Sequence, residues 1–329
     1  MADILSFDTV AAFCREFGLE AIAVLAPVPE TLDPTGLDRC LSAGVGDMTW
    51  LAAHRDLRLR PRQLLPAAAA VILVLLPYRP DADDGGVLRR ARYADGVDYH
   101  KLLRKRLSRL GRRLSAGSGH HYRATVDSAP VNERSLAQLA GLGWIGRNAL
   151  LLHPRRGSYH FIGALFTTRP LQAQHGTSDA DRCGTCTACE VACPTAALRD
   201  RQVDNTRCIS YWTIEHQGVI PRRLAARFAG WWFGCDICQE VCPWNRFALP
   251  AGDARLVGSG QEAPDELLSI TAADFDHVFA GRAIRRLGWS RFRRNLLVAL
   301  FSLDRRADAT QLLTDPDVLV QEQRIELGW

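Results

Sequence analysis

The hydrophobic pattern in the first half of the chain predicts helices and strands in turn. Apolar residues recur at helical spacing from residue 8, and a glycine and an acid then mark a turn before 21–25, which reads as a strand. Residues 66–78 form a continuous apolar run bounded by prolines, which is typical of a buried central strand. The pattern therefore predicts an α/β core.

Residues 99–114 predict a long amphipathic helix with a basic outer face. Leucines at 102, 103, 107, 110 and 114 share one side of this helix, and seven lysines and arginines surround the rest. A face of this kind is commonly an ordinary solvated surface, and binding to RNA phosphates is the alternative interpretation.

The remaining pattern divides the chain into three regions. A further strand is expected to end at Asp127, and polar residues at 171–181 and 251–266 predict linkers. Residues 270–313 predict two or more arginine-rich helices. We therefore expect an α/β domain at 1–172, a cysteine-rich domain at 173–250 and a helical region at 251–329.

Composition is consistent with several domains and with a polyanionic partner. The chain has 329 residues, a length at which proteins usually divide into more than one domain, and 47% of its residues are hydrophobic. Its net charge of +5 reflects 41 Lys and Arg against 36 Asp and Glu, and the excess is mostly arginine. The amino end has no basic region typical of an export signal, and no apolar run is long enough to span a membrane. We expect a soluble, cytoplasmic protein.

The strongest chemical signal is a cluster of cysteines. Eight of the ten cysteines lie between residues 183 and 242. The first four form the run C-x2-C-x2-C-x3-C-P, which is typical of bacterial ferredoxins, and the last three repeat the x2 and x3 spacings before another proline. Cys208 can supply the ligand that this second set lacks.

This spacing predicts two 4Fe-4S clusters. In two-cluster ferredoxins the fourth cysteine of the run serves the other cluster. We therefore assign cluster one to Cys183, Cys186, Cys189 and Cys242, and cluster two to Cys193, Cys208, Cys235 and Cys238. Structural zinc, the alternative, would show isolated C-x2-C pairs rather than these runs. Cys14 and Cys40 fit neither pattern and are expected to be plain thiols.

Two clusters conduct electrons, so the residues before 173 must bind whatever receives them. No G-x-G-x-x-G and no P-loop is present, which argues against nicotinamide, flavin-Rossmann or ATP chemistry.

Four segments, ADGVDYHKLLRKRL, VDSAPVNERSLAQLAGLGWIGRNALLL, RCISYWTIEHQGVIP and GCDICQEVCPWNR, together resemble the epoxyqueuosine reductase family. The resemblance covers about residues 45–250. It implies a cobalamin-dependent oxidoreductase that reduces epoxyqueuosine in the tRNA anticodon loop to queuosine, the last step of that modification. It also implies a nitroreductase-like α/β (α+β) core, a two-cluster ferredoxin-like domain and a short HEAT-like helical end.

The resemblance also implies roles for individual residues. Asp127, in the VDSAP segment, would be the general acid, and we expect its carboxyl to retain a proton beside an apolar corrin. Its bland alternative is a strand-end aspartate that starts a turn. The other residues expected to line the corrin are Leu151 and Ile162, with the segment between them, and Ser210, Cys235 and Asp236.

The same resemblance leaves two features open. The signature D-x-H-x-x-G, which supplies the lower cobalt ligand in many corrinoid proteins, is absent, so we expect base-off cobalamin without a protein histidine. Family members often carry arginine at the position of Ala53, and Arg55 or Arg58 is the candidate replacement.

The carboxyl-terminal helices carry a dense set of arginines with two interpretations. In a tRNA enzyme they would bind backbone phosphates, and otherwise they form a solvated helical surface. The candidates are Arg282, Arg285, Arg286, Arg291, Arg293 and Arg294.

Two other functions compete with this one. A reductive dehalogenase also joins a corrinoid to two clusters, but typically begins with a twin-arginine signal. An electron-transfer subunit would carry clusters and no corrinoid. For the reductase we expect a monomer that takes electrons from an external low-potential donor.

Overall fold

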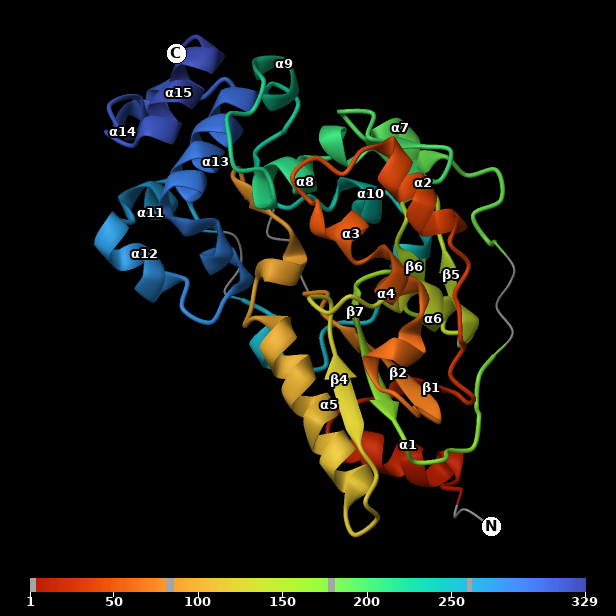
Figure 1. Ribbon diagram of the computed structural model, residues 1–329. Coiled ribbons are helices and arrows are strands. Elements are labelled where there is room, and N and C mark those ends of the chain that lie inside the picture. The colour runs from red at the N-terminus through yellow and green to blue at the C-terminus, as the bar shows by residue number, and fades with distance from the viewer. Residues whose placement is uncertain (1–3, 81–85, 177–180, 259–261) are drawn as a thin grey trace.

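The apolar run at 66–78 forms strand β2 (Ala70–Pro77), an inner strand of a four-stranded sheet. The structure is a computed structural model that describes residues 4–80, 86–176, 181–258 and 262–329 (Figure 1). Strands follow the order β1 (Ala21–Leu25), β2, β7 (His160–Thr167), β4 (Tyr122–Thr125), and every neighbouring pair is antiparallel. The expected strands at 21–25 and 66–78 are therefore confirmed, in a mixed α and β fold whose sheet is antiparallel.

Helices cover both faces of this sheet, which is why β2 is apolar throughout. Ile72 and Val74 share a core with α1 (Phe7–Glu16) and α5 (Tyr99–Ser115). Val71 and Leu73 point the other way, into a core with α6 (Glu133–Leu139). Because strand side chains alternate between faces, a strand buried on both sides needs apolar residues at every position.

Helix α5 matches its prediction in length and orientation. Its five predicted leucines are all buried, and Asp98 caps its amino end. Part of its basic face is already engaged inside the molecule. Arg106 forms an ion pair with Asp253, and the Arg109 and Arg113 guanidinium groups lie over phenylalanine rings of α1 and the turn after it.

Strand β4 ends two residues earlier than predicted, at Thr125. Asp127 has a φ of 50°, in the left-handed region, so it cannot continue an extended strand. The amide of Ser128 donates to the carbonyl of Val126 at 2.6 Å, which closes a tight turn around Asp127. This turn aims the aspartate away from the sheet.

The cysteine-rich segment lies across one end of the sheet (Figure 1). Its elements are α7 (Ala188–Ala192), β8 (Leu198–Arg199), β9 (Gln202–Val203), α8 (Ile209–Ile214), α9 (Arg222–Ala225), β10 (Trp231–Phe233) and α10 (Ile237–Glu240). A buried network joins this segment to the sheet domain: Gln239 donates to the hydroxyl of Tyr78 and to the carbonyl of Ser158, and Asn245 bonds to both Ser158 and Gln239. The two regions are therefore fixed to each other by hydrogen bonds.

The carboxyl-terminal helices share one hydrophobic core with the end of the cysteine-rich segment. Trp231, Trp232 and Phe233 are fully buried in that core, among α12 (Ala272–Val278) and α13 (Gly288–Ser302). The other helices of this region are α11 (Pro264–Ser269), α14 (Thr310–Leu313) and α15 (Val318–Leu327). The helices expected at 270–313 are thus present, while the domain boundaries stay a prediction.

Shorter elements complete the described chain. They are α2 (Thr35–Ala43), α3 (Trp50–Ala53), α4 (Arg55–Leu59), β3 (Arg89–Arg90), β5 (Trp144–Ile145) and β6 (Leu151–Leu152). The predicted linkers lie partly outside the described residues, at 177–180 and 259–261. Within the described ranges, no helix is long and apolar enough to cross a membrane.

Candidate functional site

Asp127 lies where the end of β4 meets the first turn of α5. Its Oδ2 accepts hydrogen bonds from the Tyr99 hydroxyl and from Nε2 of His100, each at 2.9 Å. Nδ1 of His100 bonds at 2.7 Å to Asp98, the residue that caps α5. The Tyr99 ring stacks on Phe161 at 3.9 Å, which fixes the phenol beside the carboxylate.

These contacts decide where the proton of this group resides. Burial alone would raise the pKa of Asp127, but hydrogen bonds from His100 and Tyr99 hold it below its ordinary value. Burial likewise disfavours protonated His100, yet the bonds to Asp127 and Asp98 raise its pKa to about 9. These hydrogen bonds favour the carboxylate form of Asp127 and the protonated form of His100, whereas the sequence alone predicts a protonated Asp127.

Asp127 combines exposure with desolvation. Its side chain is 61% exposed, although burial is the largest single influence on its pKa. The carboxylate can therefore be reached from solvent, while protein groups lie beside it. Access of this kind is needed by an acid that acts on a bound molecule.

The eight clustered cysteines fall into two neighbouring groups. Cys189 interacts electrostatically with Cys183 and Cys242, and Cys242 also interacts with Cys186. Cys208 interacts with Cys193, Cys235 with Cys208 and Cys238, and Cys238 with Cys208, Cys193 and also Cys189 of the first group. The two groups therefore adjoin at Cys189 and Cys238, and the assignment of each cysteine to a cluster stays a prediction.

The thiols are chemically available for clusters. All ten cysteines are free, and Sγ of Cys193 accepts a hydrogen bond from the amide of Ala197 at 3.3 Å, which orients it. Within the described chain, no three His, Cys, Asp or Glu side chains converge on a point that would hold a single ion. The donor set of eight thiols in two groups fits cluster ligation.

The residues expected to line a corrin come from the sheet domain and from the cysteine-rich segment, and their role stays a prediction. Leu151 and Ile162 are buried or half-buried in the sheet domain, and Ser210 lies in α8. Asp236 is buried and accepts the amide of Arg92 at 2.8 Å. The pKa of the Tyr93 phenol, raised by burial, responds to the charges of both Asp127 and Asp236. Tyr93 therefore links the predicted acid to the segment that carries Cys235.

The two candidates to replace the family arginine at Ala53 differ in position. Arg55 is bound to Asp38 through two hydrogen bonds of 2.6 and 2.7 Å. Arg58 is buried, and the charges of Glu133 and Asp127 act on it. Of the two, Arg58 is the one beside the acid.

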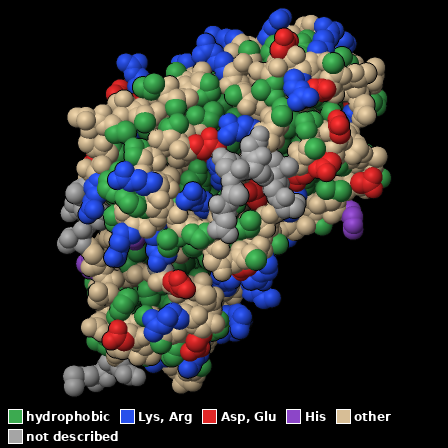
Figure 2. Space-filling view, turned by 180° about the vertical axis from the view of Figure 1, so that it is seen from behind, with side chains coloured by type: hydrophobic (Ala, Val, Ile, Leu, Met, Phe, Trp, Pro, Cys, Tyr) green, Lys and Arg blue, Asp and Glu red, His purple; other side chains and the backbone are tan. Residues whose placement is uncertain are grey.

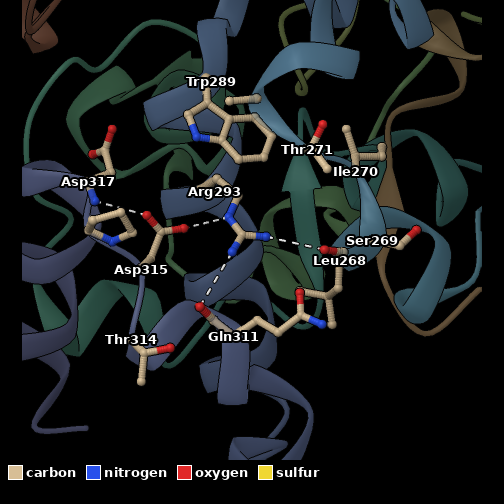
Figure 3. Close-up of a pocket in the computed structure, with 12 residues that line it drawn as sticks. Leu268, Ser269, Ile270, Thr271, Trp289, Arg293, Gln311, Thr314, Asp315 and Asp317 are labelled. Carbon is tan, nitrogen blue, oxygen red and sulfur yellow. Dashed lines mark hydrogen bonds and ion pairs between the residues drawn. The ribbon is translucent and has the colours of Figure 1, made fainter.

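The carboxyl-terminal arginines separate into buried and exposed sets. Arg294 is fully buried, and Arg293 is 6% exposed, bound to Asp315 at 2.7 Å and stacked on Trp289 (Figure 3). Arg291 donates to three carbonyl oxygens, those of Leu287, Ile214 and Arg286. These three arginines hold the fold together, which corrects their assignment to phosphates.

Two of the other three arginines are accessible. The side chains of Arg285 and Arg286 are 53% and 46% exposed and pair with Asp276 and Glu215, while Arg282 is 20% exposed and pairs with Glu262. Arg286 is close enough to Asp127 to lower the pKa of the aspartate. Basic and acidic side chains are interspersed on the face in Figure 2. A phosphate contact would therefore be local rather than spread over one large basic patch.

Sequence reasoning missed Tyr99 and His100. The signal was available: Asp98 precedes them as a helix cap, which places both side chains at the start of α5. Their convergence on Asp127 depends on long-range packing of α5 against β4 and was not readable from spacing.

A mixed α and β domain with an accessible carboxylate, joined to a segment that gathers eight free thiols, is typical of an iron-sulfur redox enzyme. Two family models match the chain: "Epoxyqueuosine reductase QueG, DUF1730" over residues 58–128 and "4Fe-4S double cluster binding domain" over residues 182–245. The epoxyqueuosine reductase of Pseudomonas aeruginosa is 42% identical over 299 residues, covering 87% of this chain and 82% of the relative. That of Escherichia coli is 38% identical, covering 91% and 82%. The chain belongs to the epoxyqueuosine reductase family.

Solved structures show the same fold. A crystal structure of epoxyqueuosine reductase with an epoxyqueuosine-modified tRNA-Tyr stem loop superposes with a TM-score of 0.83 at 24% identity, covering 98% of this chain and 89% of that one. The enzyme from Streptococcus thermophilus gives a TM-score of 0.77 at 23% identity, covering 97% and 89%.

Proposed function

We propose that this protein reduces epoxyqueuosine at the wobble position of tRNA to queuosine. The observation that carries the proposal is the 2.9 Å hydrogen bond between His100 and the solvent-accessible Asp127 carboxylate. The family relatives are named for this reaction, and one related structure contains the modified stem loop.

The reaction defines what the residues must do. Converting an epoxide to an alkene takes two electrons and two protons, and the oxygen leaves as water. Asp127 faces the oxygen and passes on the proton that His100 holds, since a 2.9 Å hydrogen bond joins them. Tyr99 orients the carboxylate through its own hydrogen bond. The assigned cysteine sets would hold two 4Fe-4S clusters, which would supply electrons one at a time from an external low-potential donor.

Cobalamin is the cofactor that we infer to bind beside Asp127. When bound, it supplies a reduced cobalt centre that is a strong nucleophile or electron donor toward strained C–O bonds. Residues proposed to line it are Asp127, Leu151, Ile162, Ser210, Cys235 and Asp236. We propose the base-off form without a protein ligand, because both ring nitrogens of the nearby His100 are engaged by carboxylates.

Substrate binding would use shape and a few charges. We propose that Arg285 and Arg286 bind tRNA phosphates, because their side chains are accessible and Arg286 lies near Asp127, and that Arg282 beside them contributes its charge. The flipped wobble base would bind beside Asp127. The finer fold assignments, a nitroreductase-like core and a HEAT-like end, belong to this proposal, as do a monomeric state and a cytoplasmic location beside the tRNA substrate.

The test is an anaerobic turnover assay. Protein with reconstituted clusters, cobalamin and a low-potential reductant is incubated with epoxyqueuosine-containing tRNA, and the digested nucleosides are measured by mass spectrometry. We expect conversion to queuosine that requires cobalamin, and a rate roughly 10²- to 10⁴-fold lower for Asp127→Asn. Full turnover by Asp127→Asn, with cofactor content unchanged, would show that this carboxylate is not the acid.

A further inference from the structure

Glu133 is a second carboxyl group beside Asp127, six residues later in the chain, at the start of α6. Its Oε1 is buried and has no hydrogen-bond partner within the described residues. Buried polar atoms nearly always form hydrogen bonds, so a buried carboxyl oxygen without one, close to the candidate acid, requires an explanation.

Arg58 is in a matching condition. It is buried, donates from Nη1 to the carbonyl of Val131 at 3.2 Å, and lies over the Trp50 ring at 5.1 Å. Its Nε has no partner in the described part of the chain, and the charge of Glu133 acts on it without a direct ion pair being formed. The cation therefore lies near the carboxyl and leaves its oxygen free to bond elsewhere.

Burial and the charge of Asp127 favour the protonated form of Glu133. They raise its pKa to about 8, against weaker opposing effects of its own backbone amide, Arg58 and Arg134. Tyr99 faces it from α5, where the charge of Glu133 helps to raise the phenol pKa. At neutral pH this group is a carboxylic acid, whereas Asp127 is a carboxylate.

The reaction needs two protons, and the His100 and Asp127 pair holds only one. We propose that Glu133 is the second proton donor of the reduction, an inference that rests on the proposed function. The first proton, from His100 through Asp127, goes to the epoxide oxygen as one C–O bond breaks. The second, from Glu133, goes to the same oxygen as the other C–O bond breaks. Water leaves, the C=C bond forms, and two electrons come from the low-potential donor through the clusters.

This division of labour follows from electrostatics. Two carboxyl groups close together cannot both ionise cheaply, so one keeps its proton while the other is charged. Once Glu133 has given its proton, Arg58 stabilises the new carboxylate. Arg58 thereby acts as a positioning residue for Glu133 and does not touch the substrate.

The first test is a titration that does not depend on turnover. In the cluster-loaded protein labelled with [13C]glutamate, the carboxyl signal lost in Glu133→Gln identifies Glu133. We expect this signal to titrate near pH 8, and to titrate at lower pH in Asp127→Asn because the neighbouring negative charge is gone. A signal that titrates at the ordinary glutamate value, about 4.3, would overturn the proposal.

The second test separates catalysis from binding. Glu133→Gln keeps size and polarity but cannot donate this proton, so we expect kcat on epoxyqueuosine tRNA to fall roughly 100-fold with KM unchanged. Exposed Glu20→Gln is the matched control and should leave both constants unchanged. A rise in KM alone would mean that Glu133 recognises the substrate, and unchanged kcat would mean that it has no role in proton transfer.

Two further results keep the inference distinct from the proposed function. Glu133→Asp retains a carboxyl group and should recover part of kcat. If the role of Glu133 were only structural, Glu133→Asp and Glu133→Gln would lose kcat equally when their iron contents are equal. An inactive wild-type protein would sink the proposed function together with this role. An active wild type with a fully active Glu133→Gln would sink only the role of Glu133.

Discussion

Arg294 is expected to act in stability rather than in tRNA binding. It is fully buried in α13, and its guanidinium makes five hydrogen bonds, which match its five N–H donors. Three of these bonds reach the carbonyls of Trp212, His216 and Gly218, where the chain leaves α8. Arg294 therefore donates hydrogen bonds to backbone carbonyls at the end of α8, where the helix no longer supplies N–H donors.

The Arg294→Met variant removes all five bonds at once while keeping much of the volume. Each buried acceptor left without a donor costs about 1–3 kcal/mol. The apolar packing of methionine and local relaxation of the structure offset part of this loss of stability. The net effect should be similar to that of removing one partner from a buried charged pair. The expected net loss is about 3–5 kcal/mol, which lowers the apparent melting temperature by roughly 10 °C for a chain of this size.

Thermal unfolding should be followed at a fixed scan rate, with cluster absorbance recorded in parallel so that cluster loss is not mistaken for unfolding. The control is Arg286→Met, whose side chain is 46% exposed. That variant should keep its melting temperature and bind tRNA more weakly, with a salt slope smaller by about one. If Arg294→Met melts like the wild type and instead loses tRNA affinity, the assignment of this arginine to the fold is refuted.

Three other predictions follow from the site. By NMR, His100 should titrate near pH 9, and its pKa should fall toward about 6.5 in Asp127→Asn. The raised pKa of His100 also contributes to stability, and this contribution is complete below about pH 6.5 and lost as pH rises through 9. The stability of His100→Gln should therefore lack this pH dependence. Cys208→Ser should lower the iron content by about four atoms per chain, whereas Cys40→Ser should not change it. Asn245→Ala should reduce the free energy of unfolding by about 1–3 kcal/mol, because it leaves the buried Ser158 and Gln239 groups without partners.

The sequence pattern predicted those strands and helices whose position depends on residues close together in the chain. The run at 66–78 had to be a buried strand, because only a two-sided core removes so many adjacent apolar residues from water. The five leucines of α5 fixed its inner face, because helical geometry places them together. The cysteine spacing pointed to two ligand sets for the same kind of reason.

The site depended on contacts that spacing does not encode. Asp127 was found through resemblance, but its protonation state was not, because the donors that lower its pKa come from the start of α5. The arginines of α13 show the same limit. A run of arginines predicts a solvated face, and nothing local tells that Arg294 meets carbonyls of a turn some 80 residues earlier.

The proposed proton and electron routes meet only if the sheet domain and the cysteine-rich segment are held in one arrangement. Residues 171–176, expected to be a linker, instead lie against the sheet domain, where Gln174 pairs with Val24. These contacts do not fix the cysteine-rich segment. The buried bonds among Tyr78, Ser158, Gln239 and Asn245 do, and Gln239 directly follows the cluster ligand candidate Cys238. Strand β2 ends beside Tyr78, so the sheet that supports Asp127 is tied through this network to the helix that carries a cluster thiol. A change in the network should therefore disturb electron delivery before it disturbs the acid.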